Sequence, residues 1–135
     1  MNYAAGVAIS SIETVGWLRA GVGIALIAAP GAPTRLVGRP APDGPGLLLM
    51  RTIGIRDLVL GLGAVAAARS DDGKEGRRWA TAALASDSLD SATSLASYRS
   101  IGKRDSWGAA LLAAAFVAGD LRALRSLSKA EPKAL

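Results

Sequence analysis

The sequence predicts an all-α protein, a four-helix transmembrane bundle with up-down-up-down topology. Half of the 135 residues are hydrophobic, 20% are charged and the mean hydropathy is +0.30, which is typical of a membrane protein that keeps some charge. Prolines, glycines or runs of charge separate four apolar stretches. Each stretch is close to the roughly 20 residues that a helix needs to cross a bilayer: about residues 4–29, 46–68, 78–98 and 107–126. We therefore expect one integral domain of the cell membrane over residues 1–135.

A water-soluble four-helix bundle is the alternative fold. It would need a polar stripe along the outside of every helix, whereas the first, second and fourth stretches are apolar nearly all round. The first stretch lacks the basic start of a secretory signal peptide, and Pro30 would directly follow the small residues of a cleavage site. We therefore expect an uncleaved first span.

Composition excludes several kinds of site. Cys and His are absent, which removes disulfides, thiol nucleophiles, Cys or His metal sites and Ser-His-Asp triads, and we expect no metal and no cofactor. The net charge is +5, but basic and acidic residues are interleaved between apolar stretches, which fits orientation in an anionic membrane better than binding of nucleic acid. Gly21-Val22-Gly23 lacks the third glycine of a dinucleotide-binding loop, and Gly61-Leu62-Gly63 indicates close helix packing.

Charged residues inside the apolar stretches are the candidate functional residues. An isolated Arg, Lys or Asp at the centre of a span costs about 2.5–3.5 kcal/mol. In the first stretch, Arg19 lies at the edge of a helical face that is mostly made of small residues. The members of this face are Glu13, Gly16, Ala20 and Gly23. Another helix can approach closely there.

The second stretch has two charged directions. One arc of about 120° on the helix holds two charged residues and three apolar ones: Arg51, Gly54, Asp57, Leu58 and Gly61. Arg56 points elsewhere. Arg51 and Asp57 can therefore address one neighbouring helix, and Arg56 another.

The third stretch is too polar to insert alone, yet its polar residues are not scattered. They fall within an arc of about 120°: Asp87, Asp90, Ser91, Ser94, Ser97 and Tyr98. We expect this helix to face inward, with Asp87 and Asp90 close enough to share a proton as a general acid does. The fourth stretch carries Asp120 toward its end.

Basic residues predict the orientation. Four spans place both termini and the segment 69–78 on one side with eight basic residues, against five on the other, so we expect both termini in the cytoplasm. Counting about 1.5 Å per residue from each helix middle places four charged residues near the bilayer centre: Arg56, Asp57, Asp87 and Asp90. Arg19 and Arg51 then lie in the outer half, and Glu13 and Asp120 in the inner half.

We expect these eight residues to form one intramembrane polar site. Arginine and carboxylate side chains cancel each other's charge, and three such pairs leave two acids that are either protonated or in contact with a water-filled cavity. Arg56 or Arg51 should pair with Asp87 or Asp90, so the second and third helices should be neighbours. The same network could serve only to fix helix register.

Three segments carry a resemblance to known proteins: Trp17-Leu18-Arg19-Ala20-Gly21 with Pro30, Arg51-Thr52-Ile53-Gly54-Ile55-Arg56-Asp57-Leu58-Val59-Leu60-Gly61, and Asp87 with Asp90. Through them, the first three helices resemble a family of small bacterial four-span membrane proteins of unknown function. The Leu18-Arg19-x-Gly21 element is also loosely similar to DoxX-like membrane proteins. The resemblance implies the four-helix membrane architecture, and it brings no reaction and no catalytic residue.

Two classes of function fit this sequence, and whether the protein is an enzyme stays open. The first is a non-catalytic accessory protein that binds a lipid, another membrane protein or a second copy of itself. The second is an intramembrane enzyme or carrier that uses Asp87 and Asp90 for acid chemistry on a lipid or isoprenoid-like substrate. A deep cavity reaching these two aspartates would favour the second class, and a filled interior would favour the first.

Overall fold

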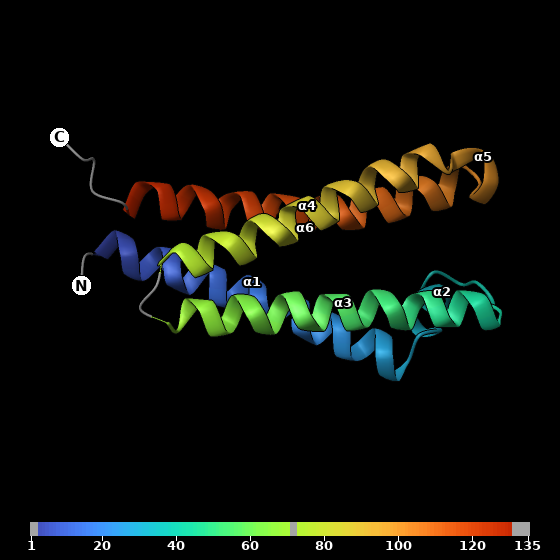
Figure 1. Cartoon of the computed structure of the whole chain (residues 1–135). Helices are drawn as coiled ribbons and strands as arrows, with labels where there is room; N and C mark the ends of the chain where they lie inside the picture. The colour runs from blue at the N-terminus through green and yellow to red at the C-terminus, as the bar shows by residue number, and fades with distance from the viewer. Residues whose placement is uncertain (1–2, 71–72, 131–135) are drawn as a thin grey trace.

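The computed structural model describes residues 3–70 and 73–130, and this part of the chain consists of helices and the turns and loops that connect them, with no strand (Figure 1). The predicted all-α class is therefore confirmed. The described residues form four long helices: α1 (Tyr3–Ala28), α3 (Gly44–Ala68), α4 (Gly73–Ala96) and α6 (Lys103–Ala130). Two short ones lie in the connections: α2 (Ala32–Leu36) and α5 (Tyr98–Ile101).

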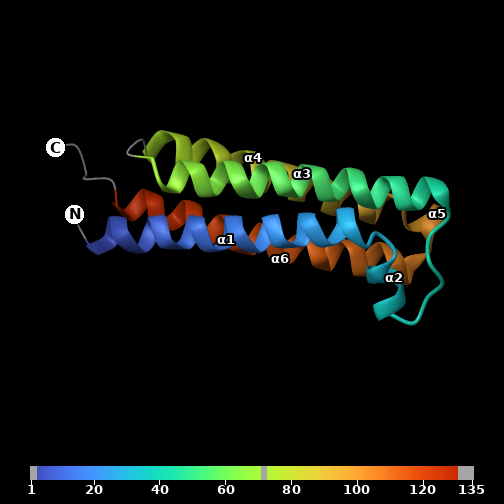
Figure 2. The ribbon, with the colours of Figure 1, turned by 90° about the horizontal axis from the view of Figure 1, so that it is seen from below.

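The long helices form two pairs. α1 packs along α3 and α4 packs along α6 (Figures 1 and 2), and the pairs meet where α1 contacts α6 and α3 contacts α4. The prediction that the second and third long helices are neighbours is confirmed. Successive long helices run in opposite directions, so the start of α1 and the end of α6 lie at one end of the molecule, while α2 and α5 lie at the other (Figure 1).

Three of the long helices begin earlier than the sequence predicts. α3 begins at Gly44 because Asp43 caps it: the carboxylate accepts a hydrogen bond from the Gly46 N–H at 2.9 Å, and Pro45 suits the first turn. α4 begins at Gly73, inside segment 69–78 and before the expected start at about residue 78, and α6 begins four residues before its expected start. Hydropathy locates only the apolar part of a helix, and polar end turns extend beyond it.

The pair α1 and α3 approaches closely along a row of small residues. Gly16, Ala20 and Gly23 of α1 face Gly54 and Gly61 of α3. A Cβ atom added to Gly23 would lie 2.6 Å from the Gly54 carbonyl oxygen, and one added to Gly61 would lie 2.6 Å from the Ala20 nitrogen. The predicted close approach through small residues is therefore confirmed.

The interior is built from small residues and the surface from large apolar ones. Among the described residues, the buried apolar positions are eight alanines together with Ile12 and Val65. Large apolar side chains are instead exposed along the long helices, among them Leu18, Ile24, Ile55, Val59, Leu89 and Leu111. A water-soluble helical protein would place such side chains inside.

Two of the described helices are long and apolar enough to cross a membrane, judged by length and composition. They are α1, over Ser11–Ala28, and α6, over Lys103–Ser126. α3 carries three charged residues between Arg51 and Asp57, and α4 is rich in Ser, Thr and Asp. Composition therefore supports two of the four predicted spans directly.

Candidate functional site

Each of the four long helices contributes one almost fully buried charged side chain to a single interior cluster. Arg19 comes from α1, Asp57 from α3, Asp87 from α4 and Asp120 from α6, and these residues are only 2% to 5% exposed. Because every member lies on a different helix, the cluster joins all four. We call these four residues the Arg19 cluster.

The Arg19 guanidinium binds all three carboxylates. Its Nη1 donates to Asp87 Oδ1 at 3.1 Å and to Asp57 Oδ1 at 3.4 Å. Its Nη2 donates to Asp120 Oδ2 at 3.1 Å and to Asp87 Oδ2. The contact with Asp87 is thus bidentate, the strongest arrangement available to an arginine and a carboxylate.

Close helix packing brings these side chains together. Asp57 lies between Gly54 and Gly61, where α3 approaches α1 most closely, so even a short aspartate side chain reaches Arg19. On α6, the ring of Phe116 lies one helical turn before Asp120, and its centroid is 4.7 Å from Arg19 Cζ. An aromatic face at this distance stabilises the cation further.

Arg56 extends the cluster toward the surface. Its Nη1 donates to Asp90 Oδ2 at 2.6 Å, and its Nη2 donates to Asp57 Oδ1 at 3.1 Å. Asp57 therefore bridges Arg19 and Arg56. The predicted pairing of Arg56 with an aspartate of the third long helix is confirmed, and its partner is Asp90.

Charge in the extended cluster does not balance. Two arginines, Arg19 and Arg56, face four aspartates, which leaves a formal charge of −2 if every group is ionised. Buried charge without a counter-ion is costly, and protons on the carboxyl groups can balance the excess. The sequence predicted such an excess of two acids, although from a partly different set of residues.

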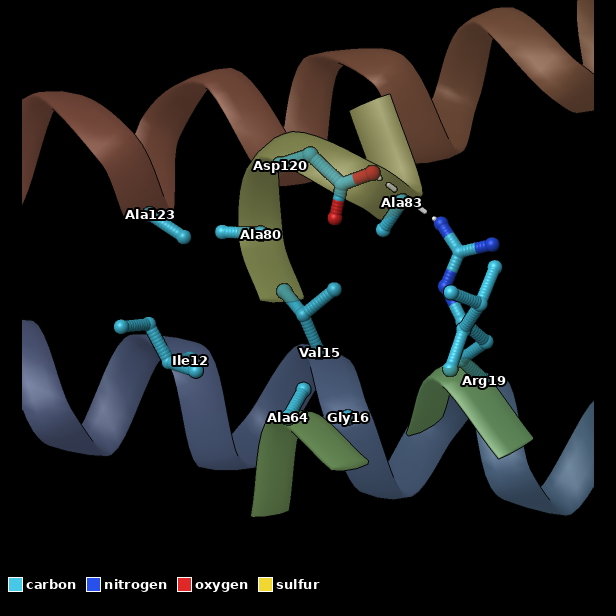
Figure 3. Close-up of a pocket in the computed structure, with 10 residues that line it drawn as sticks. Ile12, Val15, Gly16, Arg19, Ala64, Ala80, Ala83, Asp120 and Ala123 are labelled. Carbon is cyan, nitrogen blue, oxygen red and sulfur yellow. Dashed lines mark hydrogen bonds and ion pairs between the residues drawn. The ribbon is translucent and has the colours of Figure 1, made fainter. Parts of the chain in front are cut away.

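A small pocket adjoins the cluster (Figure 3). Arg19 and Asp120 line it together with small apolar side chains such as Ala64, Ala80 and Ala83. The space open to the centre of a water molecule is about 10 Å³, which suffices for about one ordered water. Pockets that bind small molecules are typically about 300–1,000 Å³, so this pocket does not admit a lipid.

The structure places two of the eight predicted site residues outside the extended cluster, which consists of the Arg19 cluster with Arg56 and Asp90. Glu13 pairs with Arg69 at 2.6 Å, and its side chain is 30% exposed. Arg51 is exposed and forms no hydrogen bond or ion pair with the part of the chain that the structure describes. The predicted 120° arc of α3 has Gly54 and Gly61 at its centre, and α1 packs on these two glycines. Arg51 lies at the edge of this arc and therefore does not reach the interior.

The predicted depths need correction. They put Arg19 and Asp120 in opposite halves of the bilayer, whereas these side chains lie 3.1 Å apart. The prediction aligned helix midpoints, but α1 and α6 are staggered: Val15, near the middle of α1, lies against Gly119, which is beyond the middle of α6. Sequence alone contains no signal for this stagger.

The structure also gives Asp87 and Asp90 different partners. Asp87 binds Arg19, while Asp90 binds Arg56. The sequence predicted that these two carboxyl groups share one proton and act as a general acid. Each of them instead forms an ion pair with its own arginine, and these ion pairs compete with the sharing of a proton. Asp120 shares Arg19 with Asp87 and, of the four aspartates, is the one that lines the pocket.

Comparisons with known proteins add no identity. No family, no curated protein and no solved structure matches this chain. The resemblance to four-span membrane proteins of unknown function stays a prediction.

Proposed function

We propose that the chain is an integral protein of the cell membrane with four spans, α1, α3, α4 and α6, and that it is a non-catalytic accessory protein that binds lipids or other membrane helices. The observation that carries this proposal is the reversed distribution of side chains, with charges inside and large apolar residues outside. In water, extended apolar surface drives association. In a bilayer, the same surface is the one that lipid tails favour.

Ion pairs support the two helices that would insert poorly alone. Charges that would cost about 2.5–3.5 kcal/mol each as isolated residues meet a partner on a neighbouring helix: Asp57 and Asp87 at Arg19, and Arg56 at Asp90. α3 and α4 are therefore expected to be stable in the membrane when they are packed with α1 and α6.

The site favours a structural role over catalysis. The four aspartates already bind arginines, and the adjoining pocket holds about one water. A buried ionic cluster of this kind can fix which helices pack together and in what register. Binding of lipids or partner helices is then left to the outer apolar surface.

Acid chemistry within the membrane is a second candidate, favoured by the formal charge of −2 on the extended cluster. Movement of protons needs only water-sized space, so the pocket beside Asp120 fits a proton relay better than a lipid substrate. Proton flux across liposomes that contain the protein, abolished by Asp120→Asn, would favour this candidate. Equal leakage with and without the protein would favour the accessory role.

Membrane fractionation tests the main proposal. The full chain should remain in the membrane pellet after an alkaline wash and should require detergent for extraction. Native mass spectrometry of the extracted protein should then detect bound phospholipid. Recovery of the folded protein in the soluble fraction without detergent would overturn the proposal.

A further inference from the structure

One ion pair of the extended cluster lies at the surface. The side chains of Arg56 and Asp90 are 31% and 41% exposed, whereas the members of the Arg19 cluster are covered on all sides. Arg56 is the middle residue of α3, about 18 Å from either helix end at about 1.5 Å per residue. If α3 spans a membrane, this pair lies near the hydrocarbon centre and far from the headgroups that an arginine at a helix end can reach.

Exposed side chains flank this pair on α3 and α4. Helical periodicity places Thr52 and Val59 beside Arg56, and Thr93 beside Asp90, and all three are exposed. Leu89, on the outer side of α4, is 67% exposed. We call these residues, together with Arg56 and Asp90, the α3–α4 face.

The ion pair has unused hydrogen-bonding capacity on this face. Arg56 has five N–H donors and makes three hydrogen bonds. Asp90 accepts through Oδ2, and its Oδ1 accepts no hydrogen bond from the described residues. A partner that covers this face must therefore offer both an acceptor for Arg56 and a donor for Asp90.

We infer that the α3–α4 face binds a second copy of this chain in a dimer with two-fold symmetry; this inference rests on the proposed membrane location. Copies in one membrane share one orientation, so the symmetry axis must run parallel to the helices. Arg56 and Asp90 are in contact, so they lie at the same height along the helix axes, side by side on two neighbouring helices. Rotation by half a turn about that axis exchanges their sides, which places Arg56 of each copy opposite Asp90 of the other.

The dimer would complete the polar site at the surface. Two Arg56 and two Asp90 side chains would alternate in a ring of four charges, and no charge would face lipid. A lipid phosphate could serve only the arginine, and an unrelated helix would need its own complementary pair at this depth. The second copy supplies both groups through symmetry alone, and Val59 and Leu89 supply apolar contact around the ring.

Disulfide crosslinking tests this geometry directly, because the chain contains no cysteine. Two differently tagged full-length chains are coexpressed, one with Val59→Cys and the other with Leu89→Cys, and membranes are oxidised. We expect a crosslinked heterodimer, because the two residues lie on opposite sides of the symmetry axis and at similar levels. The matched control, Leu111→Cys in place of Leu89→Cys, replaces a leucine of similar exposure (65%) on α6 and should give no crosslink.

A second measurement uses the charges. The variant Arg56→Met with Asp90→Leu should weaken dimerisation in liposomes by at least about tenfold, measured by energy transfer between labelled copies, because interhelical hydrogen bonds stabilise association in membranes. A wild-type protein that sits in the membrane but is monomeric would overturn the dimer and leave the proposed function intact. Monomers that carry one phospholipid, lost in the double variant, would overturn it in favour of a lipid site. Soluble protein would instead overturn the proposed function itself.

Discussion

Arg19 makes contacts that no other residue type can reproduce. A planar guanidinium carries five donors in a fixed fork, and here it serves carboxylates from three other helices. A lysine would keep the charge but could not bind Asp87 through two parallel hydrogen bonds while reaching Asp57 and Asp120. The residue is therefore a single point on which the packing of four helices depends.

Replacement of Arg19 should be severely destabilising. Arg19→Leu leaves Asp87 and Asp120 buried without a cation and leaves Asp57 with Arg56 alone. Breaking one buried pair already costs about 3–5 kcal/mol, so we expect a loss at or above the top of that range. Arg19→Lys should lose less. Thermal unfolding of the detergent-extracted protein measures both.

Arg51→Leu is the matched control for this experiment, since Arg51 is exposed and lies outside the cluster. It should change the free energy of unfolding by no more than about 0.5 kcal/mol. Similar losses for Arg19→Leu and Arg51→Leu would contradict the central position of Arg19.

At the scale of helices, the packing of α1 on α3 depends on the absence of side chains at particular positions. Gly23→Ala would bring a Cβ atom to 2.6 Å from backbone atoms of Gly54 and Leu58, which cannot rotate away. We expect a loss of about 1–3 kcal/mol, measured by thermal unfolding. The same loss is expected of Gly61→Ala, whose Cβ atom would meet the backbone of α1.

Gly21 supplies the control within the same helix. A Cβ atom there would meet nothing within 4 Å, and alanine favours a helix over glycine by roughly 0.5–1 kcal/mol. Gly21→Ala should therefore be neutral or stabilising. If Gly21→Ala and Gly23→Ala behaved alike, the close approach of α1 and α3 would be wrong.

Sequence reasoning succeeded for properties of a single helix and for the ion pair across one short connection, and it failed for contacts that depend on the axial shift between helices. The face of Gly16, Ala20 and Gly23 could be predicted because helical periodicity fixes it, and the Arg56 pairing followed from neighbouring helices joined by a short connection. The partners of Arg19 could not be predicted, because they depend on how far each helix is shifted along its axis. The packing of particular side chains sets this axial shift, and the hydropathy of the sequence does not predict it.

For the whole molecule, ion pairs at both ends complement the central cluster. Glu13 of α1 binds Arg69 at the end where α3 finishes, while Arg39, in the connection after α2, binds Asp105 of α6 at the other. Exposed pairs of this kind contribute only about 0–1 kcal/mol each. The stability of the assembled helices therefore depends mainly on the interior.

The proposed orientation can be read by cysteine labelling of intact cells. Ser100→Cys lies at the end with five basic residues, and Ser70→Cys lies at the end with eight. A maleimide that cannot cross membranes should label Ser100→Cys in intact cells and Ser70→Cys only after lysis, because positively charged connections stay in the cytoplasm. Labelling in the opposite order would mean that the orientation is inverted.

The distribution of the Arg19 cluster over four helices has a consequence for synthesis. Asp57 follows Arg19 by 38 residues, Asp87 by 68 and Asp120 by 101, so a ribosome delivers the cation long before the last of its counter-ions. In a chain that enters the bilayer in order of translation, α1 carries its arginine alone until α3 arrives. Assembly cannot finish before α6 emerges, and a chain truncated before α6 would lack both Asp120 and the aromatic cover of Phe116. The interior is therefore complete only after α6 has joined the other three long helices.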